Sequence, residues 1–596
     1  MNRRRRRKTV AVLFVAVLAA ICLPVGLFHL KRLSTDDASR RDHRHLSLSP
    51  IQKDDDQRIP DDNVILDLLK VFDEAGTLSA PVPPTQISPY TLNDVISVLP
   101  TFEDVVGVVI YDPSTDKFIL HYSNNMKWKG GCHKLVGSFR ALAHSLRSMF
   151  PDRFAKGSGQ PELAIAISSG DYPEVDLGIG KGFSRLRRNR NCFIGNKRDH
   201  SACVPSDLAP VLQFGSAFKS PEIYPSMIAM PMPQNNHLAC FETFAAHPGA
   251  ICPMLLPRIR GNPRGLVFEE TVGLGWNDLI PSVVWRGTDF SYLHRFYPRL
   301  RQPNFERDVG SKLESSRIEY NAKEVAAQAT REAATRAMRE VYDQLIPRWK
   351  SVVWTAEAER EAEEKQMELP EDSEEVIVPW ANMKFAGAMH AGKKTSTLKI
   401  PYYQEFEEHG IPASGEGMSL EALARYKYNI DTGGGGGTTW SGTLEKLGLP
   451  GVLFHHETPM KDYLHEKMVK WVHYVPIKDD LSDLKEKFDW AESHPELAKQ
   501  ISDNATRLAK SLGTHEGFSI MFNEFYETPL RTVIEAYKPL TKRDPVWLDA
   551  MINNELRPII QCSGYSSHDC EGLVDDVTFT RGARHDGDFQ KSERRK

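Results

Sequence analysis

The stretch NIDTGGGGGTTWSG, residues 429–442, constrains the fold of this chain more than any other feature. It follows residues 426–430, whose composition is typical of a strand, and it precedes residues 444–449, which favour a helix. Glycine loses more backbone freedom on folding than any other residue, so five in a row are costly to order. They also let backbone N–H groups approach a ligand closely, and before a helix they can form a cradle for a diphosphate. A floppy surface loop is the alternative interpretation of the same residues.

Apolar runs of strand length alternate with helical patterns on both sides of residue 280. The strand candidates are residues 105–112, 163–168, 282–289, 426–430 and 452–456, and a helical pattern at 132–150 separates the first two. Strand, helix, strand is the signature of an α/β unit with a parallel sheet. The sequence therefore predicts two α/β domains, residues 63–280 and 281–525, with ligands at the carboxyl ends of the strands.

A charged stretch, residues 312–365, interrupts the second domain. Ala334, Met338, Val341 and Leu345 mark one apolar face, which predicts a solvated surface helix with a single buried stripe. The acidic residues 357–375 are expected to form a loop. A coiled coil that binds a partner is the alternative for this stretch, although it would need a longer heptad repeat.

The N-terminus predicts a membrane anchor. Arg3–Lys8 precede about twenty residues without a charged side chain, and a run of about that length spans a bilayer as a helix. Basic residues favour the cytoplasmic side, which gives a cytoplasmic tail at 1–8, a signal anchor at 9–30 and a flexible stem at 31–62. A cleaved signal peptide is the alternative. Residues 526–596 are expected to form a C-terminal helix and a disordered tail.

Cysteine positions and net charge limit the partners. Seven of the eight cysteines follow the anchor and would face an oxidising lumen, where disulfides persist. Local pairs are plausible at Cys192/Cys203, Cys240/Cys252 and Cys562/Cys570, but sequence alone does not decide the pairing. Asn504 begins a glycosylation tripeptide, Asn-Ala-Thr. A net charge of -4 gives no reason to expect a nucleic acid as partner.

The segment from the Tyr-Lys-Tyr strand through the glycines, "GVLFHH", "WVHYVPI" and "DLSDL" to an Ala-rich helix resembles the C-terminal half of glycosyltransferase family 90. This is the family of capsule-associated xylosyltransferases and KDEL-type protein O-glucosyltransferases. The resemblance implies a GT-B fold, with two Rossmann-like domains facing across a cleft. It also implies a UDP-sugar as co-substrate, inversion of the anomeric carbon, and neither a bound metal nor another cofactor.

The resemblance also implies site residues. Asp171, in "SSGDYP", falls on the catalytic base, which takes the proton of the acceptor hydroxyl. Arg286, in "VVWRGT", falls on a donor-site arginine that would bind the diphosphate. The remaining candidates for donor binding are Gly436, Gly437, Trp440, Ser441, Thr443 and His455. Without the resemblance, Asp171 would be a turn residue, Arg286 an ion-paired strand end and His455 structural. Many relatives carry an arginine where this chain has Thr443, which leaves the donor sugar and the rate open.

Together these observations predict a single-pass type II membrane protein of the Golgi or endoplasmic reticulum. Its luminal body would transfer glucose or xylose from a UDP-sugar to a hydroxyl of a protein or glycan. Two rival hypotheses remain. One is an inactive family member that binds carbohydrate or protein, and the other is a tethering protein that works through residues 312–365.

Overall fold

The computed structural model describes residues 58–75, 87–98, 106–123 except 114 and 115, parts of 139–154, 160–168, short segments between 193 and 258, 265–290, 299–315, 323–387, 402–433, 442–539 except 459, and 556–558. The chain divides into two compact units, residues 1–56 and 57–596, and every described residue belongs to the second. The predicted tail, anchor and most of the stem therefore lie outside the described residues. Within the described ranges, no helix combines the length and apolar character needed to cross a membrane.

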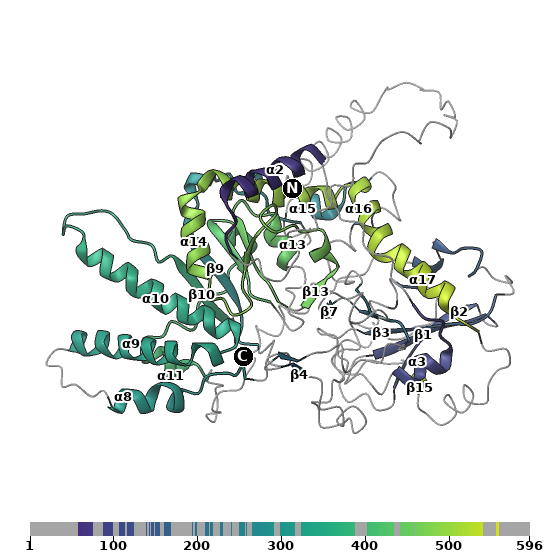
Figure 1. Cartoon of the computed structure of the whole chain (residues 1–596), viewed down its shortest axis with the longest axis horizontal. Helices are drawn as coiled ribbons and strands as arrows, with labels where there is room; N and C mark the ends of the chain where they lie inside the picture. The colour runs from purple at the N-terminus through teal and green to yellow at the C-terminus, as the bar shows by residue number, and fades with distance from the viewer. Residues whose placement is uncertain are drawn as a thin grey trace, which may run out of the picture. The chain divides into compact units, whose positions relative to one another are not determined.

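The C-terminal half is built on a five-stranded parallel sheet in the order β10-β9-β11-β12-β14 (Figure 1). Its strands are β9 (Ile280–Thr288), β10 (Ala381–Gly387), β11 (Tyr426–Asp431), β12 (Val452–His456) and β14 (Val475–Ile477). A parallel sheet covered on both faces has strands that read as apolar runs, and all five residues of β12 are buried. The strands predicted at 282–289, 426–430 and 452–456 are confirmed, and so is the α/β class.

Helices from several parts of the chain cover this sheet. α10 (Pro347–Glu368) packs on β10, and α15 (Pro495–Leu512) packs on β12. Smaller contacts come from α13 (Gly442–Leu447) and α14 (Leu484–Ser493). α2 (Asp62–Ala75) adds Ile65 and Leu69 to the same core. The predicted boundary at residue 280 is therefore crossed by an N-terminal helix that packs with the C-terminal half.

The charged stretch differs from the prediction of one surface helix followed by a loop. It forms α8 (Ser311–Ser315), α9 (Lys323–Glu340) and α10, and α10 continues through most of the acidic segment that was expected to be a loop. Alanine and glutamate favour a helix, which ends at Glu368, and Leu369 before Pro370 is already extended. Residues 347–356 are all buried. A helix buried on every side has no single apolar stripe, so its pattern does not identify it.

The N-terminal half contains a mixed sheet rather than the expected parallel one. Its order is β15-β2-β1-β3-β6-β8, and the strands are β15 (Leu556–Pro558), β2 (Lys117–Ser123), β1 (Val106–Asp112), β3 (Leu163–Ser168), β6 (Val211–Gln213) and β8 (Met227–Ala229). β1 is antiparallel to both β2 and β3, while β3, β6 and β8 are parallel. The prediction missed β2, which reverses the chain. The helical crossover therefore joins β2 to β3 and leaves β1 antiparallel between them.

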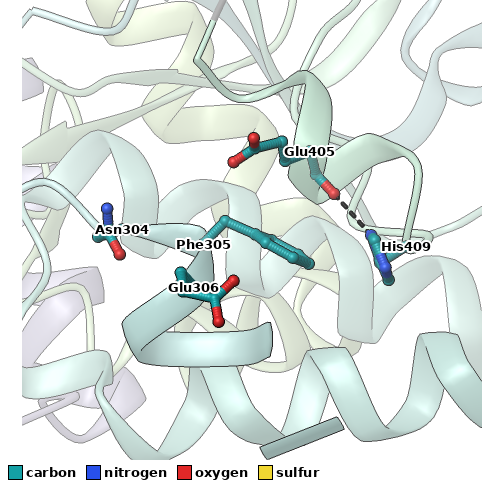
Figure 2. A pocket seen from close by; sticks show the side chains of 5 residues that line it. All are labelled: Asn304, Phe305, Glu306, Glu405 and His409. Atoms are coloured by element: carbon teal, nitrogen blue, oxygen red, sulfur yellow. Dashed lines mark hydrogen bonds between the residues drawn. The ribbon is translucent and has the colours of Figure 1, made fainter. Parts of the chain in front are cut away.

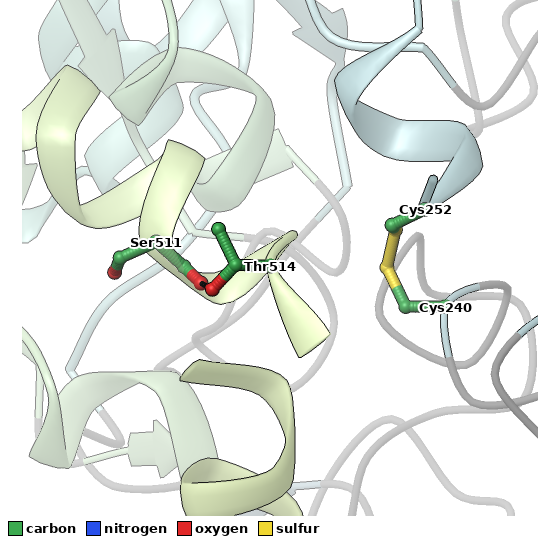
Figure 3. Close-up of a disulfide and its surroundings, with 4 residues drawn as sticks. All are labelled: Cys240, Cys252, Ser511 and Thr514. Atoms are coloured by element: carbon green, nitrogen blue, oxygen red, sulfur yellow. Dashed lines mark hydrogen bonds between the residues drawn. A yellow bond between two sulfur atoms is a disulfide. The ribbon is translucent and has the colours of Figure 1, made fainter. Parts of the chain in front are cut away.

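Strand pairing and backbone hydrogen bonds join the N-terminal half to the C-terminal half. β7 (Gly215–Ala217) pairs with β13 (Met460–Asp462), and the backbone N–H of Tyr90 donates to Ala536 in α17 (Thr528–Ala536). A disulfide joins Cys240 to Cys252, which confirms one of the plausible pairs. Both cysteines pack with side chains of α15 and α16 (His515–Phe522), close to the turn between those helices (Figure 3). The other cysteine pairs lie outside the described residues.

Candidate donor-binding site

The order of strands defines where a ligand would bind. β9 is the first strand of its sheet in the chain, the next strand (β10) lies on one side of it, and β11 lies on the other. The sheet therefore has its topological switch point between β9 and β11, and open α/β sheets bind ligands outside the carboxyl ends of the strands at that point. The glycine stretch starts there, because Gly433 follows the end of β11 by two residues.

A buried carboxylate organises the carboxyl ends of β11 and β12. Asp431 accepts hydrogen bonds from the Thr443 hydroxyl and from His455 Nδ1, both at 2.8 Å, and from the backbone N–H of His456 at 3.1 Å. Burial alone would raise the pKa of Asp431, but His455, Lys446 and Thr443 hold that pKa below its ordinary value. Asp431 is thus ionised and joins β11, β12 and α13.

Arg348, from the first turn of α10, brings a positive charge to the switch point. Its guanidinium donates to the carbonyls of Thr288 at 2.7 Å and Gly433 at 3.1 Å, and more weakly to that of Thr432 at 3.5 Å. The group also lies 5.2 Å from the ring centroid of Trp285, within range of a cation–π contact. A single buried side chain therefore links the ends of β9 and β11 and fixes the first glycine of the stretch.

Lys446 adds a second cation. It lies in α13, half-buried, and interacts electrostatically with Asp431, Glu445 and Arg348. Burial lowers the pKa of its ammonium group, while Asp431 and Glu445 oppose that shift. The carboxyl ends of β9, β11 and β12 thus gather two cations around one carboxylate. Such an arrangement favours an anionic ligand.

Arg286 faces the opposite side of β9. Its Nη1 donates to the carbonyls of Trp285 at 2.8 Å and Asn382 at 2.7 Å, its Nη2 donates to the Asn382 side chain at 3.0 Å, and its Nε donates to the carbonyl of Glu416 at 3.0 Å. Burial lowers the pKa of this guanidinium group. These bonds tie β9 to β10 and to the segment before α12 (Leu420–Leu423). A role in donor binding stays a prediction, and these contacts do not favour it.

The structure brings together only part of the predicted site. Thr443 and His455 meet at Asp431, whereas Asp171, Gly436, Gly437, Trp440 and Ser441 lie outside the described residues. Asn504 is fully buried within α15, so the folded helix leaves no room for the glycan predicted there.

Sequence reasoning missed Arg348, Asp431 and Lys446. Asp431 had a usable signal, because a carboxylate that ends an apolar strand directly before glycines falls where a parallel sheet binds its ligand. Arg348 had none, because its position depends on how a helix from a distant part of the chain packs across the sheet.

A separate hollow of about 510 Å³ lies away from these strand ends. It is lined by Asn304, Phe305, Glu306, Glu405 and His409 (Figure 2). Phe305 packs against the ring of His409, whose Nδ1 bonds the carbonyl of Glu405 at 2.8 Å. None of the residues that surround Asp431 lines this hollow.

The parallel sheet, with Arg348 and Lys446 at the carboxyl ends of its strands, places the chain in the α/β class. Comparison with known proteins narrows this class. Residues 389–527 match the model of Glycosyl transferase family 90, which confirms the predicted resemblance for that part of the chain. The match includes Asp431, Thr443 and Lys446. Arg286 and Arg348 lie before its first residue.

Curated relatives match short parts of the chain. Protein O-glucosyltransferase 2 of Danio rerio is 33% identical over 100 residues, which cover 16% of this chain and 18% of the relative. Protein O-glucosyltransferase 3 of Rattus norvegicus is 34% identical over 101 residues, again 16% of this chain and 18% of the relative. Uncharacterized protein 179R of Invertebrate iridescent virus 6 is 26% identical over 155 residues, 24% of this chain and 13% of the relative. The chain thus spans less than a fifth of the length of these relatives.

Proposed function

We propose that this chain is a glycosyltransferase that moves glucose or xylose from a UDP-sugar to a hydroxyl group of a protein or glycan. One observation carries the proposal: Arg348 and Lys446 bring positive charge to the carboxyl ends of β9 and β11, directly before a glycine stretch, and Lys446 interacts there with the carboxylate of Asp431. As the bond to the sugar breaks, negative charge builds on the departing UDP, and fixed cations stabilise that charge. The family match over residues 389–527 supports the same activity.

The proposed reaction is a single displacement. Asp171 takes the proton of the acceptor hydroxyl as its oxygen attacks the anomeric carbon on the face opposite the diphosphate, so the configuration inverts. Positive charge at the strand ends stabilises the diphosphate, and backbone N–H groups of the glycine stretch, those of Gly436 and Gly437 included, donate to it. Because the charge on the diphosphate is met by the protein's own cations, the transfer needs no metal.

The proposed setting is the secretory pathway. Residues 9–30 would anchor the chain in the Golgi or endoplasmic reticulum membrane, and the α/β body would form a GT-B enzyme in the lumen. The disulfide between Cys240 and Cys252 supports an oxidising compartment.

Substitution of Asp171 tests the chemical step. We expect Asp171→Asn to lower the release of UDP from UDP-glucose or UDP-xylose by about 100-fold or more, because a general base contributes about that much. Calorimetry should find UDP affinity within about twofold of wild type, because the base does not hold the nucleotide. Asp503→Asn, in an exposed pair with Lys499, is the matched control. An Asp171→Asn variant that releases UDP at the wild-type rate would remove Asp171 from the mechanism.

One observation favours the inactive rival. Arg286, the arginine that the resemblance assigns to the donor, uses its guanidinium to hold β10 and the carbonyl of Glu416. If wild type binds UDP-sugars but releases no UDP from any of them, the chain is a binding module and not a transferase.

A further inference from the structure

Lys446 is a cation for which the described residues supply no direct partner. Its side chain is half-buried, yet no hydrogen bond or ion pair joins its ammonium group to another described residue. Most lysines that are withdrawn from water are paired, because burying an unpaired charge is costly. An unpaired, half-buried ammonium group at a strand end is therefore a candidate for contact with a ligand.

The position of Lys446 on α13 directs it toward the strand ends. Thr443 precedes it by three residues, and residues three apart lie on the same face of a helix. The Thr443 hydroxyl bonds Asp431 at 2.8 Å, which fixes that face against the end of β11. Leu444 and Leu447 belong to the core that α13 shares with α15. Thr443 thus fixes α13 against the end of β11, where Lys446 interacts electrostatically with Asp431.

The charges around Lys446 leave positive charge unmatched. Asp431 already accepts three hydrogen bonds, two from side chains and one from the backbone of His456. Glu445 is paired with Arg258 at 3.4 Å. Arg348, from α10, adds a second positive charge nearby. The hydroxyl of Thr432, fully buried at the same strand end, also lacks a hydrogen-bond partner.

We propose that Lys446 binds the diphosphate of the sugar nucleotide directly, while Arg348 holds the backbone of Gly433 beside it. This inference rests on the proposed function and adds the residue that contacts the phosphates. The ammonium group of Lys446 acts as a compact point charge and, unlike a guanidinium group, does not need paired donors in one plane. The ammonium group has no hydrogen bond or ion pair among the described residues because the diphosphate is its partner.

Calorimetry with UDP, uridine and inorganic pyrophosphate tests the assignment. We expect Lys446→Met to lower UDP affinity by about 10- to 100-fold, the range for loss of one charge-assisted hydrogen bond. Lys446→Arg, which keeps the charge, should stay within about fivefold of wild type. Uridine lacks phosphates, so its affinity should not change in either variant. Lys499→Met, at an exposed lysine of α15, is the matched control.

The outcomes separate the inference from the proposed function. Wild-type affinity for UDP in Lys446→Met would overturn the role of Lys446 and leave the proposed function standing. Another outcome is that wild type binds pyrophosphate but not UDP, and that Lys446→Met loses the pyrophosphate binding. That result would keep Lys446 as a residue that binds an anion and would reject the nucleotide donor. Binding of neither would reject both.

Two further readouts exclude a merely structural role. Removal of a desolvated charge should leave the melting temperature of ligand-free Lys446→Met at or above that of wild type. Because the pKa of Lys446 is lowered, its charge is lost as pH rises, so wild-type UDP affinity should fall in alkaline solution. The other charged groups that act on it are Asp431, Glu445 and Arg348, and His455 bonds Asp431. Lys446→Arg should show a smaller fall in UDP affinity. A lower melting temperature or equal pH profiles would contradict the proposal.

Discussion

An arginine lies on each side of β9: Arg286, from β9 itself, is half-buried, and Arg348, from α10, is buried. The two side chains make different contacts. On the β10 side, Arg286 bonds backbone carbonyls and one amide side chain, and these hydrogen bonds join neighbouring segments of the fold. On the β11 side, Arg348 also bonds carbonyls, but it lies near Asp431, Lys446 and the start of the glycine stretch. A strand-end arginine is therefore not a ligand-binding residue by position alone. Open α/β sheets bind ligands at the topological switch point, so we expect Arg348 and not Arg286 to act in ligand binding.

Arg348→Ala should have the largest effect on the β11 side. The substitution removes this donor from the carbonyls of Thr288, Thr432 and Gly433. The two buried carbonyls, those of Thr432 and Gly433, are left unsatisfied at about 1–3 kcal/mol each, or about 2–6 kcal/mol together. We expect urea denaturation to show a fall of that size in the free energy of unfolding, with loss of UDP binding. Arg348→Lys keeps the positive charge but lacks the planar, multi-donor guanidinium group. Its free energy of unfolding and its UDP affinity should lie between those of wild type and Arg348→Ala. Unchanged stability in Arg348→Ala would remove the link between β9 and β11 from this account.

Arg286→Ala should have a smaller and purely structural effect. Its loss leaves the carbonyls of Asn382 and Glu416 to water or to weaker partners, at a cost of about 1–3 kcal/mol in unfolding free energy. UDP affinity, measured by calorimetry, should stay within about twofold of wild type. If UDP affinity falls as far as in Arg348→Ala, the assignment that follows from the family resemblance is right and the difference between the two sides of β9 disappears.

Local sequence patterns predicted the elements of the C-terminal sheet well. The strands at 426–430 and 452–456 are short apolar runs between turn residues, and both are strands of the sheet. The glycine stretch falls at a strand end because a parallel sheet requires a loop there before the next helix. These features depend on residues close in the chain, which is why the sequence reveals them.

Features set by packing were not predictable. β2 reverses the first strand and changes a parallel sheet to a mixed one, a result of pairing that no periodicity displays. α10 is buried on all sides over residues 347–356, so its pattern lacks an amphipathic stripe. The same packing places Arg348, from a stretch expected to be a surface helix, at the carboxyl ends of β9 and β11. Arg348 was therefore missed because its neighbours in the fold lie far away in the chain.

The central claim is that the diphosphate binds at the β11 side of β9. Hydrogen exchange of backbone amides, measured with and without saturating UDP, tests it most directly, because a ligand protects the amides that it contacts or holds. We predict slower exchange in residues 426–433 and 442–447, and no change in residues 381–387 and 414–416. Protection confined to residues 381–387 and 414–416, with none in α13, would contradict the account.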